Sequence, residues 1–190
     1  MTNTSIMIVG VGGQGTLLAS RILGQTLIGA GYDVKVSEVH GMSQRGGSVT
    51  TYVRFGEKVW SPIIERGGAD IILSFELLEA LRALPYLKPD GQIIVNTQQI
   101  DPMPVITGAA EYPKNIAETL QAHARLTQVD ALTLARTAGS IKAVNVVLIG
   151  LLARRTDIPR ARWEEAIHVT VPPKFLDVNL KAFALGYEAE

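Results

Sequence analysis

The sequence predicts an α/β fold in three layers: a mostly parallel, doubly wound sheet covered by helices on both faces. Apolar runs of strand length alternate with stretches whose apolar residues recur at helical spacing, which is typical of a parallel sheet with crossover helices. In addition, the first strand leads at once into a Rossmann-like glycine loop. Because 190 residues fit one domain, we expect a single domain over residues 1–190, with C-terminal helices at about 141–187 packed on the sheet.

The glycine loop, Gly10-Val11-Gly12-Gly13-Gln14-Gly15, follows an apolar strand at residues 6–9 and opens a helix at residues 16–30. Glycines allow a tight turn and a close approach of a ligand, and a helix N-terminus favours a phosphate or carboxylate. Right-handed crossovers place the loop at the carboxyl edge of the sheet, where open α/β folds bind ligands. The loop therefore predicts an anion site. The alternative is a tight crossing that binds nothing.

A second glycine-rich segment, residues 40–48, follows the second predicted strand, Asp33–Val39. It holds several hydrogen-bond donors and one fixed cation, with too little apolar content to pack as a strand or helix. We expect it to face the glycine loop across one crevice. Residues 49–55 alternate in polarity and, with a return at residues 58–60, predict an antiparallel hairpin.

The rest of the chain continues the alternation. Buried strands are predicted at residues 70–75 and 92–96 and a short strand at residues 126–129, with a turn at Pro89-Asp90-Gly91 and a surface connection at residues 101–104. Helices are predicted at residues 76–84, 113–124, 131–138, 142–154, 157–170 and 175–187. The helix at 142–154 is apolar almost all round, so its Asn145 is predicted to be a buried hydrogen-bonding group.

The composition excludes several classes of function. Eighteen basic and eighteen acidic residues cancel without a basic run, which argues against nucleic acid or an anionic membrane as the main partner. The absence of cysteine excludes disulfides and iron–sulfur ligation on this chain, and three scattered histidines predict no metal site. We expect a cytoplasmic protein, because there is no secretory pattern and the longest apolar run, residues 143–153, is too short to span a bilayer.

Nearly the whole chain carries segments that point to a known family. The most specific are the glycine loop, Ser37-Glu38-Val39-His40-Gly41-Met42-Ser43-Gln44-Arg45-Gly46-Gly47-Ser48, Val53-Arg54-Phe55-Gly56 and Val171-Pro172-Pro173-Lys174-Phe175. These segments closely resemble the gamma-type component of 2-oxoacid:ferredoxin oxidoreductases, in particular the beta subunit of the indolepyruvate enzymes.

The resemblance implies a reaction in which a 2-oxoacid and coenzyme A give an acyl-CoA, carbon dioxide and two electrons for ferredoxin. Such enzymes use thiamine diphosphate, magnesium and iron–sulfur clusters. This chain lacks cysteine and also lacks a Gly-Asp-Gly signature for magnesium diphosphate. We therefore expect a small subunit that is inactive alone, with a larger partner that carries the thiamine cofactor and the clusters. Six Trp and Phe residues with little charge also predict a partner-facing surface, or a homodimer in isolation.

In related enzymes the corresponding domain helps to hold coenzyme A, so the two glycine-rich segments form the candidate site. Arg45 offers a planar fork for a phosphate or carboxylate, and Gln14, Gln44 and Ser48 could orient the ligand. No catalytic base is assigned. His40 and Arg45 are candidates for a direct role, with a loop hydrogen bond and a salt bridge to the partner as their respective alternatives. The complete candidate set is Gly10, Gly12, Gly13, Gln14, Gly15, His40, Gln44, Arg45, Gly46, Gly47 and Ser48.

Three other functions stay open on the sequence. A stand-alone nicotinamide-binding Rossmann oxidoreductase rests on the glycine loop and on Glu38, which ends the second strand where such enzymes keep an acid for a ribose. The doubled glycine also resembles the ATP loop of ubiquitin-activating-type adenylating enzymes, although those usually carry a cysteine. The third possibility is a structural interface subunit with an empty glycine loop.

Overall fold

The computed structural model describes residues 3–39 and 46–189. Its sheet has six strands in the order β2-β3-β1-β4-β5-β6. β1, β4, β5 and β6 pair in parallel, and β3 runs antiparallel to both of its neighbours, β1 and β2. The predicted α/β class is thus confirmed, with a mixed sheet. The strands are β1 (Thr4–Val11), β2 (Asp33–Val39), β3 (Ser48–Gly56), β4 (Ala69–Ser74), β5 (Leu87–Asn96) and β6 (Arg125–Val129).

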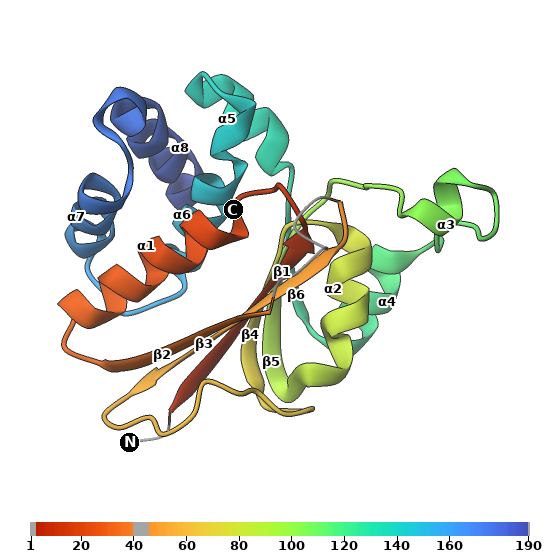
Figure 1. Cartoon of the computed structure of the whole chain (residues 1–190), viewed down its shortest axis with the longest axis horizontal. Helices are drawn as coiled ribbons and strands as arrows, with labels where there is room; N and C mark the ends of the chain where they lie inside the picture. Colours follow the sequence, from red (N-terminus) through yellow and green to blue (C-terminus); the bar gives the residue numbers. More distant parts are fainter. Residues whose placement is uncertain (1–2, 40–45, 190) are drawn as a thin grey trace.

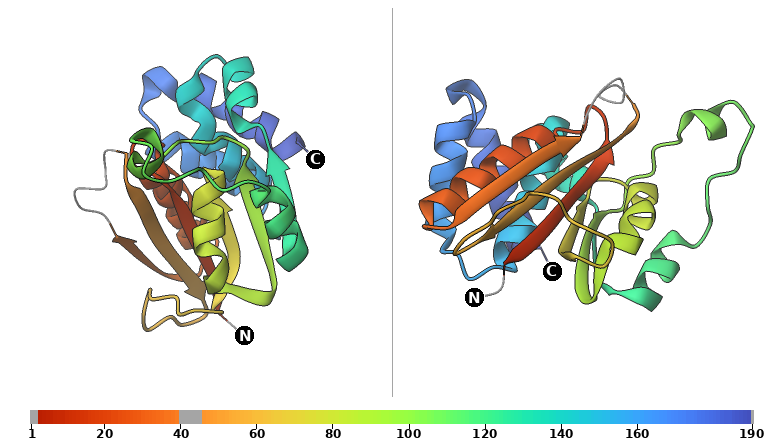
Figure 2. Two further views of the ribbon diagram at one scale, coloured as in Figure 1. Left: turned by 90° about the vertical axis from the view of Figure 1, so that its right-hand side faces the viewer. Right: turned by 60° about the horizontal axis from the view of Figure 1, so that its bottom comes forward.

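Helices cover both faces of the sheet and make the predicted three layers (Figures 1 and 2). One face carries α1 (Thr16–Gly29), α5 (Ala131–Ala138), α6 (Val144–Arg154), α7 (Arg160–Thr170) and α8 (Leu176–Glu188). The other face carries α2 (Leu77–Ala83) and α4 (Ile116–His123). None of the helices in the described ranges combines the length and the apolarity needed to cross a bilayer.

The central strand β1 separates two hydrophobic cores. Ile6 and Ile8 join the core beneath α1 and α6, whereas Met7 and Val9 join the core beneath α2 and α4. All four side chains are buried. Burial on both faces explains why this strand is a continuous apolar run rather than an alternating one.

The predicted return strand at residues 58–60 is absent, and that prediction was wrong. Residues 57–68 contain no helix or strand, and β3 forms its hairpin with β2 instead. Side chains bind the backbone of this segment: Val59 donates its amide to Asp33 Oδ2 at 2.9 Å, and Arg54 Nη1 donates to two carbonyl groups at 3.0 and 3.2 Å. Polar backbone groups satisfied in this way need no ladder partner.

The turn predicted at Pro89-Asp90-Gly91 was also wrong, because these residues lie inside β5. The pairing of β5 with β4 shifts between Ala69↔Leu87 and Ile71↔Gln92. More residues of β5 than of β4 lie between these two pairs, so an irregularity of the bulge type takes them up. Proline is tolerated there because the ladder is already interrupted.

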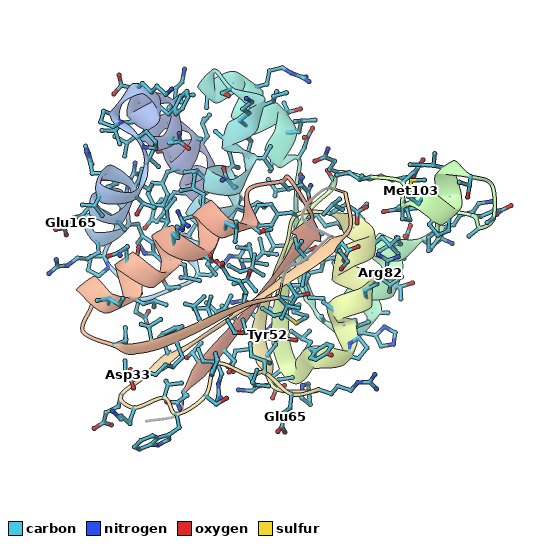
Figure 3. The ribbon with its side chains drawn as sticks, viewed as in Figure 1. Asp33, Tyr52, Glu65, Arg82, Met103 and Glu165 are labelled. Carbon is cyan, nitrogen blue, oxygen red and sulfur yellow. The ribbon has the colours of Figure 1, made fainter. Side chains whose placement is uncertain are left out.

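Between β5 and α4 the chain leaves the body of the molecule as a projecting arm, residues 99–112 (Figures 1 and 2). The surface connection predicted at residues 101–104 runs into a short helix within this arm, α3 (Met103–Ile106). Met103 and Ile106 are each 65% exposed, and Figure 3 labels Met103 at this position. The arm therefore buries little apolar surface of its own.

Helices α6 and α8 cross with their backbones in contact. A Cβ atom on Gly186 of α8 would lie 2.0 Å from the carbonyl oxygen of Val147. A Cβ atom on Gly150 of α6 would lie 2.3 Å from the carbonyl oxygen of Phe183. The predicted burial of α6 is confirmed, since the helix is buried from its first residue to Ala153.

The exposed aromatic surface is smaller than predicted. Trp60 is 85% exposed and Phe175 is 49% exposed, whereas the other four Trp and Phe side chains are buried. Of the six Trp and Phe side chains, Trp60 and Phe175 are the two available for self-association, and a homodimer stays a prediction.

Candidate functional site

The two glycine-rich segments meet at the carboxyl rim of the sheet, as far as the structure describes them. Gly12 donates its amide to the carbonyl of Gly47 at 2.8 Å, and Gly46 donates its amide to the carbonyl of Gly12 at 3.2 Å. One residue further on, Ser48 pairs with Val11 in the β3–β1 ladder. The predicted proximity of the two segments therefore holds for residues 46–48. The candidates His40, Gln44 and Arg45 lie outside the described residues.

Two glycines of the first loop have backbone conformations that other residues rarely adopt. Gly13 has φ of 100° and Gly15 has φ of 85°, both in the left-handed region. At Gly15 a Cβ atom would also lie 2.6 Å from Nδ2 of Asn145, which donates a hydrogen bond to the Gly15 carbonyl at 3.2 Å. At Gly10 a Cβ atom would lie 2.9 Å from Phe75. Asn145 is thus the buried hydrogen-bonding group that the sequence predicts.

A cavity of about 260 Å³ opens beside the glycine loop and the N-terminus of α1. No charged residue lines it among the part of the chain that the structure describes. Its wall is mainly apolar, with two hydroxyl-bearing residues, and the helix N-terminus beside it has no side-chain cap. The lining residues are Gly12, Gly13, Gly15, Thr16, Leu17, Val39, Val49 and Thr51.

Gln14 and Ser48 direct their polar atoms to other parts of the protein. Gln14 Oε1 accepts from the Val11 amide at 2.7 Å, and its Nε2 donates to the Phe75 carbonyl at 3.0 Å. The Ser48 hydroxyl donates to Glu79 Oε2 on α2 at 2.5 Å. Both side chains thus hold neighbouring segments of the protein together at the carboxyl edge of the sheet. Their contact with a ligand stays a prediction.

Polar residues that the sequence analysis did not propose as site residues adjoin the glycine loop. Asn96 Nδ2 donates to the Phe75 carbonyl at 3.1 Å, and the Gln98 side chain accepts from Asn96 at 3.3 Å and from Gln14 at 3.4 Å. Glu76 follows β4 and is fully buried. A signal for all three was available, because Asn96 is the last residue of a predicted parallel strand and Glu76 and Gln98 lie just after the carboxyl ends of such strands.

Glu76 joins α2 to the base of the arm. Its carboxylate caps α2 by accepting from the Glu79 amide at 2.9 Å, and it also accepts from the Ile100 amide at 3.1 Å and from the Tyr112 hydroxyl. Burial and then the hydrogen bond to this carboxylate raise the pKa of the Tyr112 hydroxyl. The arm therefore leaves the body from an anchored base.

Glu38 occupies a different position from the ribose-binding acid of a Rossmann enzyme. The antiparallel β3 lies between β1 and β2, whereas in the Rossmann order these two strands are neighbours. The Glu38 carboxylate also accepts a hydrogen bond from Ser20 of α1 at 2.8 Å. This arrangement gives the nicotinamide alternative no support.

The protein is thus a mixed α/β domain with a glycine-lined cavity at the carboxyl edge of its sheet. Comparisons with known proteins show which class of protein has this fold. The family model described as pyruvate ferredoxin/flavodoxin oxidoreductase matches residues 5–189. The chain belongs to this family, so the resemblance seen in the sequence is confirmed.

Individual relatives narrow the comparison. The chain is 47% identical to the indolepyruvate oxidoreductase subunit IorB of Thermococcus kodakarensis, over all of this chain and 96% of that protein. Among solved structures, the pyruvate oxidoreductase subunit PORC of Thermotoga maritima superposes with a TM-score of 0.77 at 22% identity, over 99% of this chain and 97% of that one. The 2-oxoglutarate:ferredoxin oxidoreductase of Magnetococcus marinus superposes with a TM-score of 0.76 at 18% identity, over 98% of this chain and 31% of that longer chain. The fold thus occurs both as a separate subunit and within a longer polypeptide.

Proposed function

We propose that this chain, as one domain over residues 1–190, is the small subunit of a thiamine-diphosphate-dependent 2-oxoacid:ferredoxin oxidoreductase. Its substrate is indolepyruvate or another aryl pyruvate. The reaction is the oxidative decarboxylation of the 2-oxoacid with coenzyme A to an acyl-CoA, releasing carbon dioxide, one proton and two electrons that pass to ferredoxin. Family membership and the 47% identity to a protein named as an indolepyruvate oxidoreductase subunit support this proposal.

The redox chemistry belongs to a larger partner subunit. The chain has no cysteine, so its residues do not fit an iron–sulfur cluster. Within residues 3–39 and 46–189, no group of three His, Cys, Asp or Glu side chains is placed to bind a metal ion. In this proposal the thiamine diphosphate, its magnesium ion and the clusters lie on the partner subunit, which meets ferredoxin in the cytoplasm.

The observation that carries the role of this chain is the cavity at the glycine loop. Backbone amides and the N-terminus of α1 suit a pyrophosphate at its edge, and the apolar wall suits an uncharged portion of the same ligand. Coenzyme A has both parts. In this role the amides of Gly13 and Gly15 bind the ligand, the hydroxyls of Thr16 and Thr51 orient it, and Leu17, Val39 and Val49 exclude water from the side of the active site that faces this subunit.

In this proposal the second glycine-rich segment, residues 40–48, contributes the remaining groups that bind the ligand. His40, Gln44 and Arg45 precede Gly46, whose amide binds Gly12 of the first loop. Arg45 supplies the cation that the described wall of the cavity lacks.

The first experiment co-expresses this chain with the larger subunit and measures decarboxylation of indolepyruvate. Pull-down of this chain is expected to bring the cluster-containing protein with it, and activity is expected to require both chains. Full turnover by the larger subunit alone would remove this chain from the catalytic assembly.

A substitution that fills the cavity tests its role within the complex. Val39→Trp places a large ring at the cavity, and Val36→Trp on the same strand is the matched control, because Val36 is also exposed but lines a separate groove. We expect Val39→Trp to raise the KM for coenzyme A at least about tenfold, whereas the control stays near the wild type. Equal KM values for both variants in an intact complex would favour a structural interface subunit with an empty loop.

A further inference from the structure

Glu79 is a buried carboxylate that the proposed function leaves without a role. It lies on α2, is 4% exposed, and accepts hydrogen bonds from the Ser48 hydroxyl at 2.5 Å and from Arg82 Nη1 at 2.6 Å. Arg82 is half exposed and balances the buried charge, and Figure 3 labels it on the α2 side of the sheet. The hydroxyl of Ser48 thus has a charged acceptor, which makes this a strong tie between β3 and α2.

The position of Ser48 determines which parts of the site depend on that tie. Side chains alternate along β3, so Ser48 faces α2 while Val49 and Thr51 line the cavity on the opposite face. Gly46 and Gly47, immediately before Ser48, make the two backbone hydrogen bonds to Gly12. Ser48 therefore connects the two glycines that bind the first loop, Gly46 and Gly47, to the residues of β3 that line the cavity.

We propose that Glu79 is a positioning residue for ligand binding at the cavity. Through its hydrogen bond with the Ser48 hydroxyl, Glu79 fixes the start of β3. It thereby keeps Gly46 and Gly47 hydrogen-bonded to Gly12, and it keeps Val49 in place in the wall of the cavity. The residue acts from the face of the sheet opposite the ligand and does not touch it. This inference rests on the proposed binding of coenzyme A at the glycine loop. A rim that is already ordered binds its ligand without the entropic cost of ordering it first.

The test uses the complete enzyme complex with Ser48→Ala, Ser48→Thr and Glu79→Gln in this chain. Ser48 is exposed, so its removal is expected to leave the fold intact. Ser48→Ala should raise the KM for coenzyme A about tenfold, with kcat and the KM for the 2-oxoacid within about twofold of the wild type. Ser48→Thr keeps the hydroxyl and should restore the KM. Glu79→Gln should raise the KM, and adding Ser48→Ala to it should bring little further change, because both remove one interaction.

A matched control separates positioning from a general loss of stability. Tyr112→Phe also removes a hydroxyl donor from a buried carboxylate, that of Glu76, which caps α2, but leaves the Ser48–Glu79 hydrogen bond in place. We expect it to lower the thermal midpoint without changing the KM for coenzyme A.

Two outcomes would overturn the positioning role: an unchanged KM in Ser48→Ala, or an equal rise in Ser48→Ala and Tyr112→Phe. Val39→Trp separates a failure of the coenzyme A site from a failure of the positioning role of Glu79. If Val39→Trp raises the KM and Ser48→Ala does not, the coenzyme A site stands and the role of Glu79 is lost. If neither raises it, the proposed site is lost as well.

Discussion

Two amide side chains hold the glycine loop from different sides. Gln14 links the end of β1 to the Phe75 carbonyl after β4, and Asn145 reaches from the start of α6 to the Gly15 carbonyl. The sequence predicts the role of Asn145 because a lone amide in an apolar helix needs partners. It cannot predict that of Gln14, because a loop amide has many possible partners and only the fold decides which backbone groups face it.

Asp130 provides a pH-dependent contribution to stability. It caps α5 by accepting from the Thr133 hydroxyl at 2.7 Å and the Thr133 amide at 3.0 Å, and these hydrogen bonds lower the pKa of its carboxyl from the ordinary value of 3.8. A lowered folded-state pKa means that the stabilisation is complete above the unfolded-state value and disappears as the pH falls through the folded-state value. We expect Asp130→Ala to reduce the free energy of unfolding by about 1 kcal/mol at neutral pH and by less as the pH falls below about 3.8.

Urea unfolding of the wild type and Asp130→Ala, from neutral to acidic pH, measures this difference. Glu111→Ala, which removes an exposed carboxylate from the arm, is the control. A difference between wild type and Asp130→Ala that stays constant across the acid range would contradict the assignment.

The crossing of α6 and α8 leads to a prediction about two glycines of the chain. Gly186→Ala should destabilise the protein by about 2 kcal/mol or more, because its Cβ would overlap the Val147 carbonyl and force the helices apart. Gly24→Ala in α1 is the matched control, since apart from the adjoining backbone of α1 no heavy atom lies within 4 Å of its Cβ position. That change should stabilise by about 0.5–1 kcal/mol through helix propensity. Thermal and urea unfolding of both variants give the comparison, and equal effects would disprove the close crossing.

Most elements could be predicted from the sequence, but their neighbours in the sheet could not. Each predicted strand at residues 6–9, 33–39, 70–75 and 126–129 appears within a residue or two of its bounds. The runs at residues 6–9 and 70–75 are clear because burial on both faces leaves a continuous apolar pattern, whereas β2 has no buried residue and is recognised from its valines. The partner of β3 was assigned wrongly, since alternation shows that a strand has two faces and says nothing about which strand lies beside it. For the candidate site, the meeting of residues 10–15 with residues 46–48 followed from the rule for carboxyl edges, whereas the inward bonds of Ser48 needed the register.

At the level of the complete chain, the arm is expected to be the least stable of the described parts. The amides of Val105, Ile106 and Thr107 bond only within the arm, to carbonyls of residues 102 and 103, and its apolar side chains are largely exposed. Local opening therefore costs little, whereas opening of β1 disrupts both cores. Hydrogen exchange of the isolated chain should show these three amides exchanging orders of magnitude faster than those of β1. Equal protection would mean that the arm is buried by self-association.

The position of β1 in the middle of the sheet has a consequence for synthesis on the ribosome. β1, β2 and β3 are complete once residue 56 has emerged, and they can pair before β4 exists. Until then the other edge of β1 presents unpaired amides and carbonyls among apolar side chains, which is a template for aggregation. Nascent chains that pause before residue 69 are therefore the ones that most need a chaperone.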